Sequence, residues 1–236
     1  MNLVADVRDR LRRMWTQLRT GSGTEGMDCV VLAIINLVVW ASRGRLGPKD
    51  RSEVAEWVEM VRRWAGNPDR PMLIHGDALE VLRHPEFKRM FGKAGLTPPT
   101  ATYLYGEPFG DVRAFLAKSP DHAALLPVDY GMARRDGAPM GSTTFSDAHG
   151  IVLTGAQRRR VRIRRRRYAL RWKTVVLDSL MDGRRRPGSL RRYPKGPQLT
   201  QLYRYRRAAG AFGTGPDGKP RPIGFGRTVC ILLERG

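Results

Sequence analysis

Cysteine and histidine are both scarce in this sequence. The 236 residues include two cysteines, Cys29 and Cys230, which are too few for the disulfide framework of a small secreted domain and match no zinc-ligand spacing. Three of the four histidines, His75, His84 and His122, are scattered without the spacing of a metal motif. The sequence therefore predicts neither a metal site nor a cofactor, and it favours a reduced, intracellular origin.

Long apolar runs are absent as well. The most apolar stretch, from Val30 to Ala41, has 12 residues, whereas a membrane-spanning helix needs roughly 20. We interpret it as a buried helix. The first 15 residues alternate charged and apolar side chains, unlike the continuous apolar core of a secretory signal. With 41% apolar residues and five Trp, the chain is expected to be globular and to have no membrane span.

Acidic residues are outnumbered, with 22 against 43 basic ones, and the net charge is +21. The excess is concentrated in one segment. Residues 157–207 contain seventeen Arg and two Lys against Asp178 and Asp182, a net charge of +17, and the rest of the chain carries only +4. Such a segment predicts a surface that meets phosphates or acidic partners, rather than a general adaptation to solubility.

The basic segment has two interpretations. Aromatic residues that could stack on bases interleave with the arginines, namely Tyr168, Trp172, Tyr193, Tyr203 and Tyr205. No helix-turn-helix, zinc-finger or RNA-recognition signature is present, so any contact with nucleic acid would be nonspecific, through phosphates and strongly salt-dependent. The alternative is that the arginines contact acidic surfaces of neighbouring protein subunits, since Arg is enriched in protein interfaces generally.

Helical spacing dominates the first part of the chain, and strand-like runs dominate the second. We expect helices over residues 2–19, from Cys29 to about residue 41, over 51–65, and from Asp77 onward with an interruption at Pro85. Consecutive antiparallel strands are expected over 149–155, 161–172 and 173–178, followed by a helix over 198–209 and a closing strand over 227–234. This order predicts an α+β fold with a helical half packed against an antiparallel sheet half.

Cys29 is the first candidate for chemistry. It opens the apolar helix, and the backbone N–H groups and dipole at a helix N-terminus stabilise a thiolate. Gly23 and Gly26 in the preceding loop could let the backbone approach a substrate and present an N–H to a developing oxyanion. The alternative is that Cys29 is one more small apolar residue of a buried helix, and taken alone this is the simpler interpretation.

His149 and Asp178 are the other two candidates. His149 opens an expected strand after a polar turn, where an imidazole can reach a site at the sheet edge. Asp178 ends an apolar run in the same sheet, where its carboxylate could orient the imidazole. The alternatives are a hydrogen-bonded turn histidine and an aspartate that begins a turn.

The order Cys, His, Asp on an early helix and two later strands resembles the papain-like fold. More narrowly, "GMDC", "DAHGIVLTG" and "VVLDSL" resemble papain-like peptidases of the bacteriocin-leader-processing type. The resemblance covers about Gly21 to Asp178. It implies that Cys29 is the nucleophile, His149 the general base and Asp178 the residue that fixes the imidazole.

The tail from Asp178 to Gly213 resembles papain-like proteins encoded among the virion structural genes of actinobacterial phages. This implies a phage virion structural protein, located in the virion after assembly in the host cytoplasm, whose basic C-terminal part docks onto other phage virion proteins. The expected organisation is an N-terminal amphipathic helix over 1–20, a papain-like peptidase-type domain over 21–180, and an arginine-rich extended loop, helix and closing strand over 181–236, packed on the same domain.

The sequence departs from the peptidase pattern at three places. The loop before Cys29 lacks the Gln that usually supplies an oxyanion-hole donor, and Gln17 lies back in the preceding helix. Val30 follows the cysteine where a small or aromatic residue is often found, and Ser179 follows Asp178 where proline is usual. Losing one oxyanion donor costs on the order of 100-fold in rate. The sequence therefore leaves open whether the protein is an active cysteine peptidase or amidase, or a degenerate relative, or a virion protein that contacts DNA nonspecifically.

Overall fold

The computed structural model describes residues 28–66, 75–129, 148–164, 167–179, 199–201, 213–214, 220–221 and 227–234. The expected N-terminal helix over 1–20 and the arginine-rich loop up to residue 198 lie outside the described residues. So do Gly23 and Gly26, and Gln17.

Five helices are described: α2 (Cys29–Ala41), α3 (Arg51–Trp64), α4 (His75–Arg83), α5 (Pro85–Lys93) and α6 (Phe109–Lys118). Local sequence sets their ends. The Asp50 side chain accepts hydrogen bonds from the backbone N–H groups of Ser52 and Glu53 and so caps α3. Pro85 stands in the first turn of α5, where its missing N–H costs nothing. Pro85 therefore begins a new helix, and the helix expected from Asp77 begins earlier, at His75.

Six strands form one antiparallel sheet: β1 (Thr100–Pro108), β2 (Ala123–Asp129), β3 (Ala148–Arg164), β4 (Arg167–Leu177), β5 (Leu199–Gln201) and β8 (Arg227–Glu234). Their order in space is β1-β8-β2-β3-β4-β5, and β6 (Gly213–Thr214) with β7 (Pro220–Arg221) forms a separate two-stranded sheet. The closing strand β8 lies between β1 and β2, so the end of the chain completes the sheet. The α+β class is confirmed.

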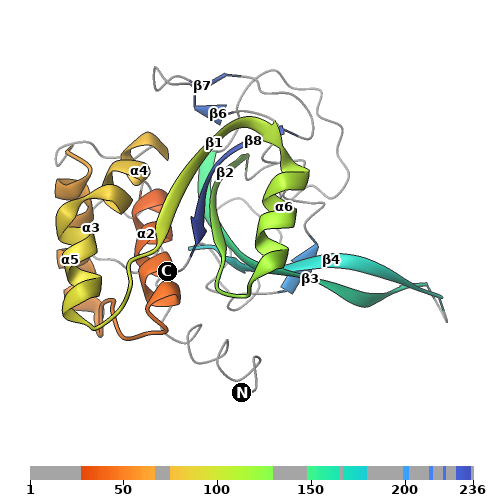
Figure 1. Ribbon diagram of the computed structural model, residues 1–236, viewed down its shortest axis with the longest axis horizontal. Coiled ribbons are helices and arrows are strands. Elements are labelled where there is room, and N and C mark those ends of the chain that lie inside the picture. Colours follow the sequence, from red (N-terminus) through yellow and green to blue (C-terminus); the bar gives the residue numbers. More distant parts are fainter. Residues whose placement is uncertain are drawn as a thin grey trace, which may run out of the picture.

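Helices cover both faces of the sheet, as Figure 1 shows. Alternate residues of β2 point to opposite faces: Leu125 packs with the core of helices α2 to α5, and Leu126 packs with the core beneath α6. Both side chains are fully buried. Burial on both faces explains why β2 reads as a continuous apolar run rather than an alternating one.

Helix α2 is the centre of the helical core. Its residues from Cys29 to Trp40 are all buried, which accounts for its apolar sequence without any membrane. Within the described part of the chain, no helix has both the length and the apolar character needed to cross a membrane.

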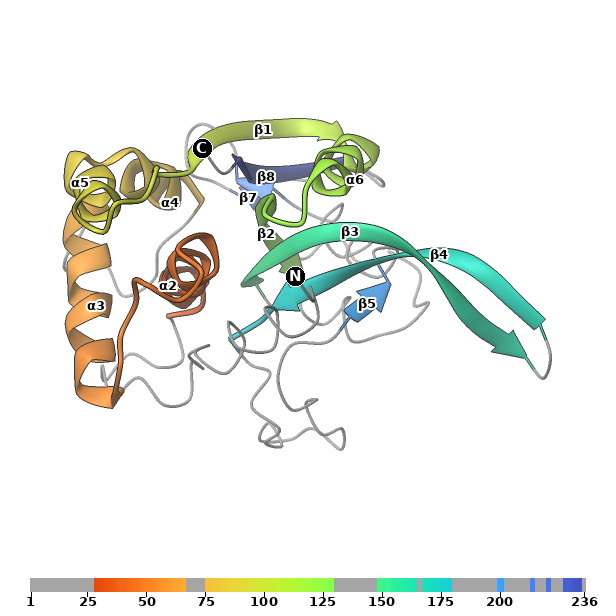
Figure 2. The same ribbon diagram turned by 60° about the horizontal axis from the view of Figure 1, so that its bottom comes forward.

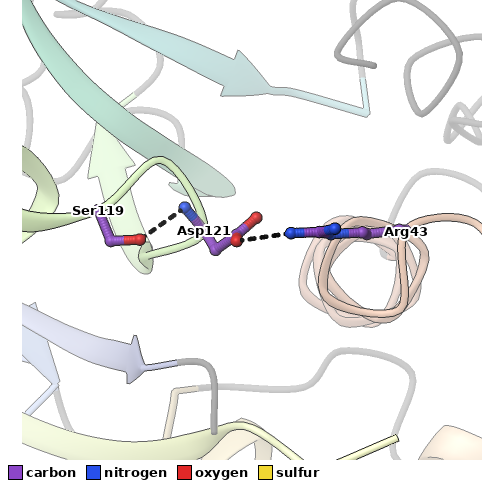
Figure 3. A network of polar contacts seen from close by, with 3 residues as sticks. All are labelled: Arg43, Ser119 and Asp121. Carbon is purple, nitrogen blue, oxygen red and sulfur yellow. Dashed lines mark hydrogen bonds and ion pairs between the residues drawn. The ribbon is translucent and has the colours of Figure 1, made fainter. Parts of the chain in front are cut away.

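Polar contacts hold the segment that follows α2. The Arg43 guanidinium donates to the Asp121 carboxylate at 3.2 Å, and the Asp121 N–H donates to the Ser119 hydroxyl (Figure 3). This contact ties the end of α2 to the turn before β2.

Two expectations about the strands are wrong. The strands expected over 149–155, 161–172 and 173–178 are in fact two long strands, β3 and β4, and the chain reverses between Arg164 and Arg167. A run of four arginines contains no Gly, Pro or Asn to mark this reversal. The helix expected over 198–209 is also wrong at its start, because Leu199–Gln201 pairs with β4 as strand β5. Pairing with a neighbouring strand there overrides the local helical spacing.

Candidate functional site

The antiparallel pairing of β3 and β4 brings two candidate residues to one end of the sheet. His149 lies at the start of β3, and Asp178 follows the last residue of β4. The first residues of one strand and the last residues of its antiparallel neighbour lie at the same end of the sheet. The register agrees, since Val152 of β3 is opposite Leu177 of β4.

The imidazole of His149 is held by Asp178. Its Nε2 lies 2.7 Å from the Asp178 Oδ1, which is the distance of a strong charge-assisted hydrogen bond. Exposure is 5% for His149 and 2% for Asp178, so water competes little for this bond. With Nε2 donating to the carboxylate, Nδ1 is the ring nitrogen available for the hydrogen bond between His149 and Cys29.

Cys29 opens α2 and completes the group of three. Its sulfur is hydrogen-bonded to the His149 side chain and to the backbone N–H groups of Gly150 and Val30. Burial by itself raises the pKa of the Cys29 thiol, but the hydrogen bond and positive charge of His149, helped by the two N–H groups, outweigh burial. The net result is a pKa below the ordinary value of 9.0. The arrangement favours a thiolate.

The pKa of His149 moves the opposite way and ends at about 10. Burial lowers it, but the charge and hydrogen bond of Asp178 raise it further, and Cys29 adds to the rise. A raised imidazole pKa beside a lowered thiol pKa favours a proton on His149 and a negative charge on Cys29. Both shifts therefore favour a thiolate–imidazolium pair, with the ring held by the Asp178 carboxylate.

Gly150 permits the close approach of β3 to α2. A Cβ at this position would lie 3.0 Å from the Val30 Cγ2 and 3.3 Å from the Val30 Cα. Because a Cβ there would be in tight contact with Val30, glycine lets the strand pack closely on the first turn of the helix and brings His149 beside Cys29. Sequence reasoning did not assign a role to Gly150, although its position directly after the histidine was a usable signal.

A buried ion pair fixes the first turn of α2 from the other side. Asp28, the residue before Cys29, has no exposed surface, and its Oδ1 accepts a hydrogen bond from the Arg62 Nη2 of α3 at 2.8 Å. Arg62 is itself only 5% exposed. The pair joins the residue next to the sulfur to the neighbouring helix. Sequence reasoning missed it, because nothing in α3 marks Arg62 as the partner of Asp28.

The other cysteine and histidines lie outside this group. Cys230 is buried in β8, and burial raises the pKa of its thiol to about 12. The His122 ring stacks on Phe115, and its Nδ1 lies 2.8 Å from the Phe115 carbonyl oxygen. His84 accepts a hydrogen bond from the Glu86 N–H at the start of α5. No group of three or more His, Cys, Asp or Glu suited to a metal ion is found among the residues that the structure describes.

Comparison with protein-family models gives no match, and comparison with the curated proteins gives none either. The function is therefore inferred from the contacts of Cys29, His149 and Asp178.

Proposed function

We propose that the protein is a cysteine hydrolase, a peptidase or amidase with a papain-like arrangement of catalytic groups. The observation that carries the proposal is the contact of three polar side chains from separate elements. Cys29 begins a helix of the helical half, His149 is the second residue of one strand, and Asp178 follows another. Nucleophile, base and orienting group lie in the order that covalent catalysis requires.

In the proposed reaction, the Cys29 thiolate attacks the carbonyl carbon of an amide and forms a tetrahedral oxyanion. Collapse of the oxyanion breaks the C–N bond, and the His149 imidazolium gives its proton to the leaving amine. His149, now neutral, then takes a proton from water, which attacks the thioester and releases the acid and the thiolate. Asp178 keeps the ring oriented and stabilises its charge in both steps.

The oxyanion needs donors at the same place. The first N–H groups of a helix lack an intrahelical acceptor, and those of the first turn of α2 lie next to the sulfur, as the hydrogen bond from the Val30 N–H shows. These N–H groups are the proposed substitute for the glutamine that the loop before Cys29 lacks. One fewer donor predicts a slower enzyme rather than an inactive one.

The test is a comparison of the two cysteines in one molecule. The full chain is treated with iodoacetamide at pH 7, and carbamidomethylation at each cysteine is followed by peptide mass spectrometry. We expect Cys29 to react faster than Cys230, because a pKa below 9.0 gives more thiolate than a pKa of about 12. The same reaction in denaturant, where both cysteines are ordinary, corrects for intrinsic differences.

A second measurement separates reactivity from catalysis. The wild-type chain and the Cys29→Ala variant are incubated with a peptide library, and new termini are identified by mass spectrometry. Cleavage by the wild-type chain alone supports the hydrolase. Equal and slow alkylation of both cysteines in the folded chain, with no cleavage, would contradict it, since Cys29 is only 6% exposed and would then be a packing residue.

The virion location and the docking onto other virion proteins stay predictions. They rest on the resemblance of the segment from Asp178 to Gly213, most of which lies outside the described residues. If the chain is a virion component, quantitative mass spectrometry of purified particles will find it at a fixed copy number. The Cys29→Ala variant will then show whether assembly depends on the chemistry.

A further inference from the structure

The hairpin of β3 and β4 extends well beyond the sheet. Past Ala156, β3 pairs with β4 alone, whereas its first part also pairs with β2. Figure 2 shows the two strands projecting together from the body of the molecule. We call residues 157–164 and 167–172 the ribbon. Two strands on their own are marginally stable. A projecting ribbon therefore adds little to the stability of the fold, and its position suits contact with another molecule.

Three arginines alternate along the β3 strand of the ribbon. Arg158, Arg160 and Arg162 are all exposed and two residues apart, so they share one face, with about 6.8 Å between neighbours. The residues opposite them on β4 are Trp172, Leu170 and Tyr168. One face of the ribbon is thus a row of guanidinium groups beside a row of apolar and aromatic side chains.

Contacts between the two rows hold two of the three arginines in place. The Arg160 guanidinium lies 4.3 Å from the centre of the Tyr168 ring, and that of Arg158 lies 5.9 Å from the Trp172 ring. At the base of the ribbon, Arg113 of α6 lies on the Trp172 ring as well, at 5.5 Å. Ordered guanidinium groups lose less rotamer freedom on binding a ligand, which raises affinity.

Two large apolar side chains of the ribbon remain open to solvent. Tyr168 is 50% and Leu170 59% exposed, and Tyr105 is the one other large hydrophobic residue of comparable exposure among the described residues. An exposed aromatic ring next to arginines is the combination that binds single-stranded nucleic acid, in which the faces of the bases are accessible. In a duplex the bases are stacked on each other, and Tyr168 would gain nothing.

The charge of the ribbon also favours nucleic acid over protein. Residues 157–164 and 167–172 include seven Arg and no Asp or Glu. A protein partner would have to supply a matching cluster of carboxylates, whereas a nucleic-acid strand carries one negative charge per nucleotide along its length. The row of alternating arginines fits such a linear polyanion.

We propose that the ribbon is a binding site for single-stranded nucleic acid, in which the row of arginines binds phosphates and Tyr168 stacks on a base. The site is separate from the Cys29 group and does not rest on the proposed hydrolase. Recognition is independent of base sequence, because it uses charge and stacking rather than hydrogen bonds to base edges.

The test is fluorescence anisotropy with the full chain and a labelled oligodeoxynucleotide of mixed sequence, as a single strand and as its duplex, over a series of NaCl concentrations. The wild-type chain is expected to bind the single strand more tightly. The triple variant R158Q/R160Q/R162Q should lower the slope of log affinity against log salt by about 2, since each phosphate contact contributes about 0.7. Tyr168→Ala should weaken single-strand binding by roughly 5-fold to 100-fold and leave duplex binding unchanged.

A matched control removes the same charge elsewhere. R63Q/R83Q/K88Q changes three exposed basic residues of the helical half and should leave affinity and salt slope close to wild type. Iodoacetamide labelling of Cys29 at the wild-type rate will show that each variant is folded. Absence of binding at low salt, or an equal loss in the control triple, would overturn the proposal. So would competition by polyglutamate as strong as that by the oligonucleotide, which would make the ribbon a docking surface for acidic proteins.

Discussion

The Nε2 of His149 lies 2.7 Å from the Oδ1 of Asp178, and both side chains are almost completely excluded from solvent. A buried carboxylate hydrogen-bonded to an imidazole favours the protonated ring. Because a protonated ring stabilises a neighbouring thiolate, Asp178 also favours the thiolate of Cys29, and this effect passes through the His149 ring. The charge of Asp178 is therefore expected to control the reactivity of a sulfur that it does not touch.

The first prediction follows from this relay of charge. Asp178→Asn keeps the shape and an acceptor oxygen but removes the charge that raises the pKa of His149. The ring then loses its proton at neutral pH, and the pKa of Cys29 rises. We expect iodoacetamide labelling of Cys29 at pH 7 to slow by about tenfold for each unit of that rise, with Cys230 unaffected. If Asp178→Asn changes the pH dependence of unfolding but leaves the labelling rate of Cys29 unchanged, Asp178 has a purely structural role.

The second prediction concerns stability against pH. The pKa of His149, raised from 6.5 to about 10, contributes stability that is present below pH 6.5 and lost as pH rises toward 10. The lowered pKa of Cys29 contributes stability that is present above pH 9.0 and lost as pH falls through the lowered value. Between the lowered pKa of Cys29 and pH 9.0, the two contributions change with pH in opposite directions, because folding adds a proton to His149 and removes one from Cys29.

The Cys29→Ala variant removes the contribution of Cys29 to this pH dependence and keeps that of His149. In the variant, His149 still gains a proton on folding, because Asp178 remains. Between the lowered pKa of Cys29 and pH 9.0, the free energy of unfolding should then fall with pH by up to about 1.4 kcal/mol per pH unit relative to the wild-type chain. Urea unfolding at several pH values measures the difference. Cys230→Ala, which leaves Cys29 and His149 in place, should track the wild-type pH dependence up to about pH 8, below the range in which the Cys230 thiol ionises in the unfolded chain. Parallel curves for the two variants would show that Cys29 and His149 are not charged in the folded state.

The three residues of the candidate site also show which features of the protein can be predicted from its sequence. Cys29, His149 and Asp178 could be found because each lies at the end of an element whose apolar run is visible in the sequence, and because neighbouring antiparallel strands bring a start and an end together. The approach of α2 to β3 could not be found. It depends on the absence of a side chain at Gly150 and on the ion pair of Asp28 with Arg62, contacts between residues far apart in the chain.

In the sheet, too, individual strands can be predicted from the local sequence, whereas their order cannot. The strand residues of β2 and β8 are recognisable from their apolar runs, but the placement of β8 between β1 and β2 depends on pairing across more than 100 residues. The reversal between β3 and β4 lies within an arginine run that carries no turn signal, and the helix expected at residue 199 gave way to pairing with β4.

The third prediction tests the close approach at Gly150. Gly150→Ala places a methyl group 3.0 Å from the Val30 Cγ2, so Val30 or the strand must shift by a few tenths of an ångström. We expect a loss of stability of about 1–3 kcal/mol and slower labelling of Cys29, because His149 moves with the strand. Val30→Ala in the same chain should recover part of both, though contact with the Val30 Cα at 3.3 Å remains. Gly92→Ala is the matched control, since a Cβ there meets nothing within 4 Å and alanine stabilises a helix interior by up to about 1 kcal/mol.

The fourth prediction concerns the buried pair of Asp28 and Arg62. Arg62→Met leaves the carboxylate of Asp28 buried without this guanidinium, which is expected to cost on the order of 3–5 kcal/mol in the free energy of unfolding. The double variant Asp28→Asn/Arg62→Met removes both charges and should be more stable than Arg62→Met alone. Chemical denaturation of the wild type, both single variants and the double variant gives the coupling energy. If the double variant is no more stable than Arg62→Met, the pair does not anchor the first turn of α2, and the position of Cys29 depends on its packing against Gly150 instead.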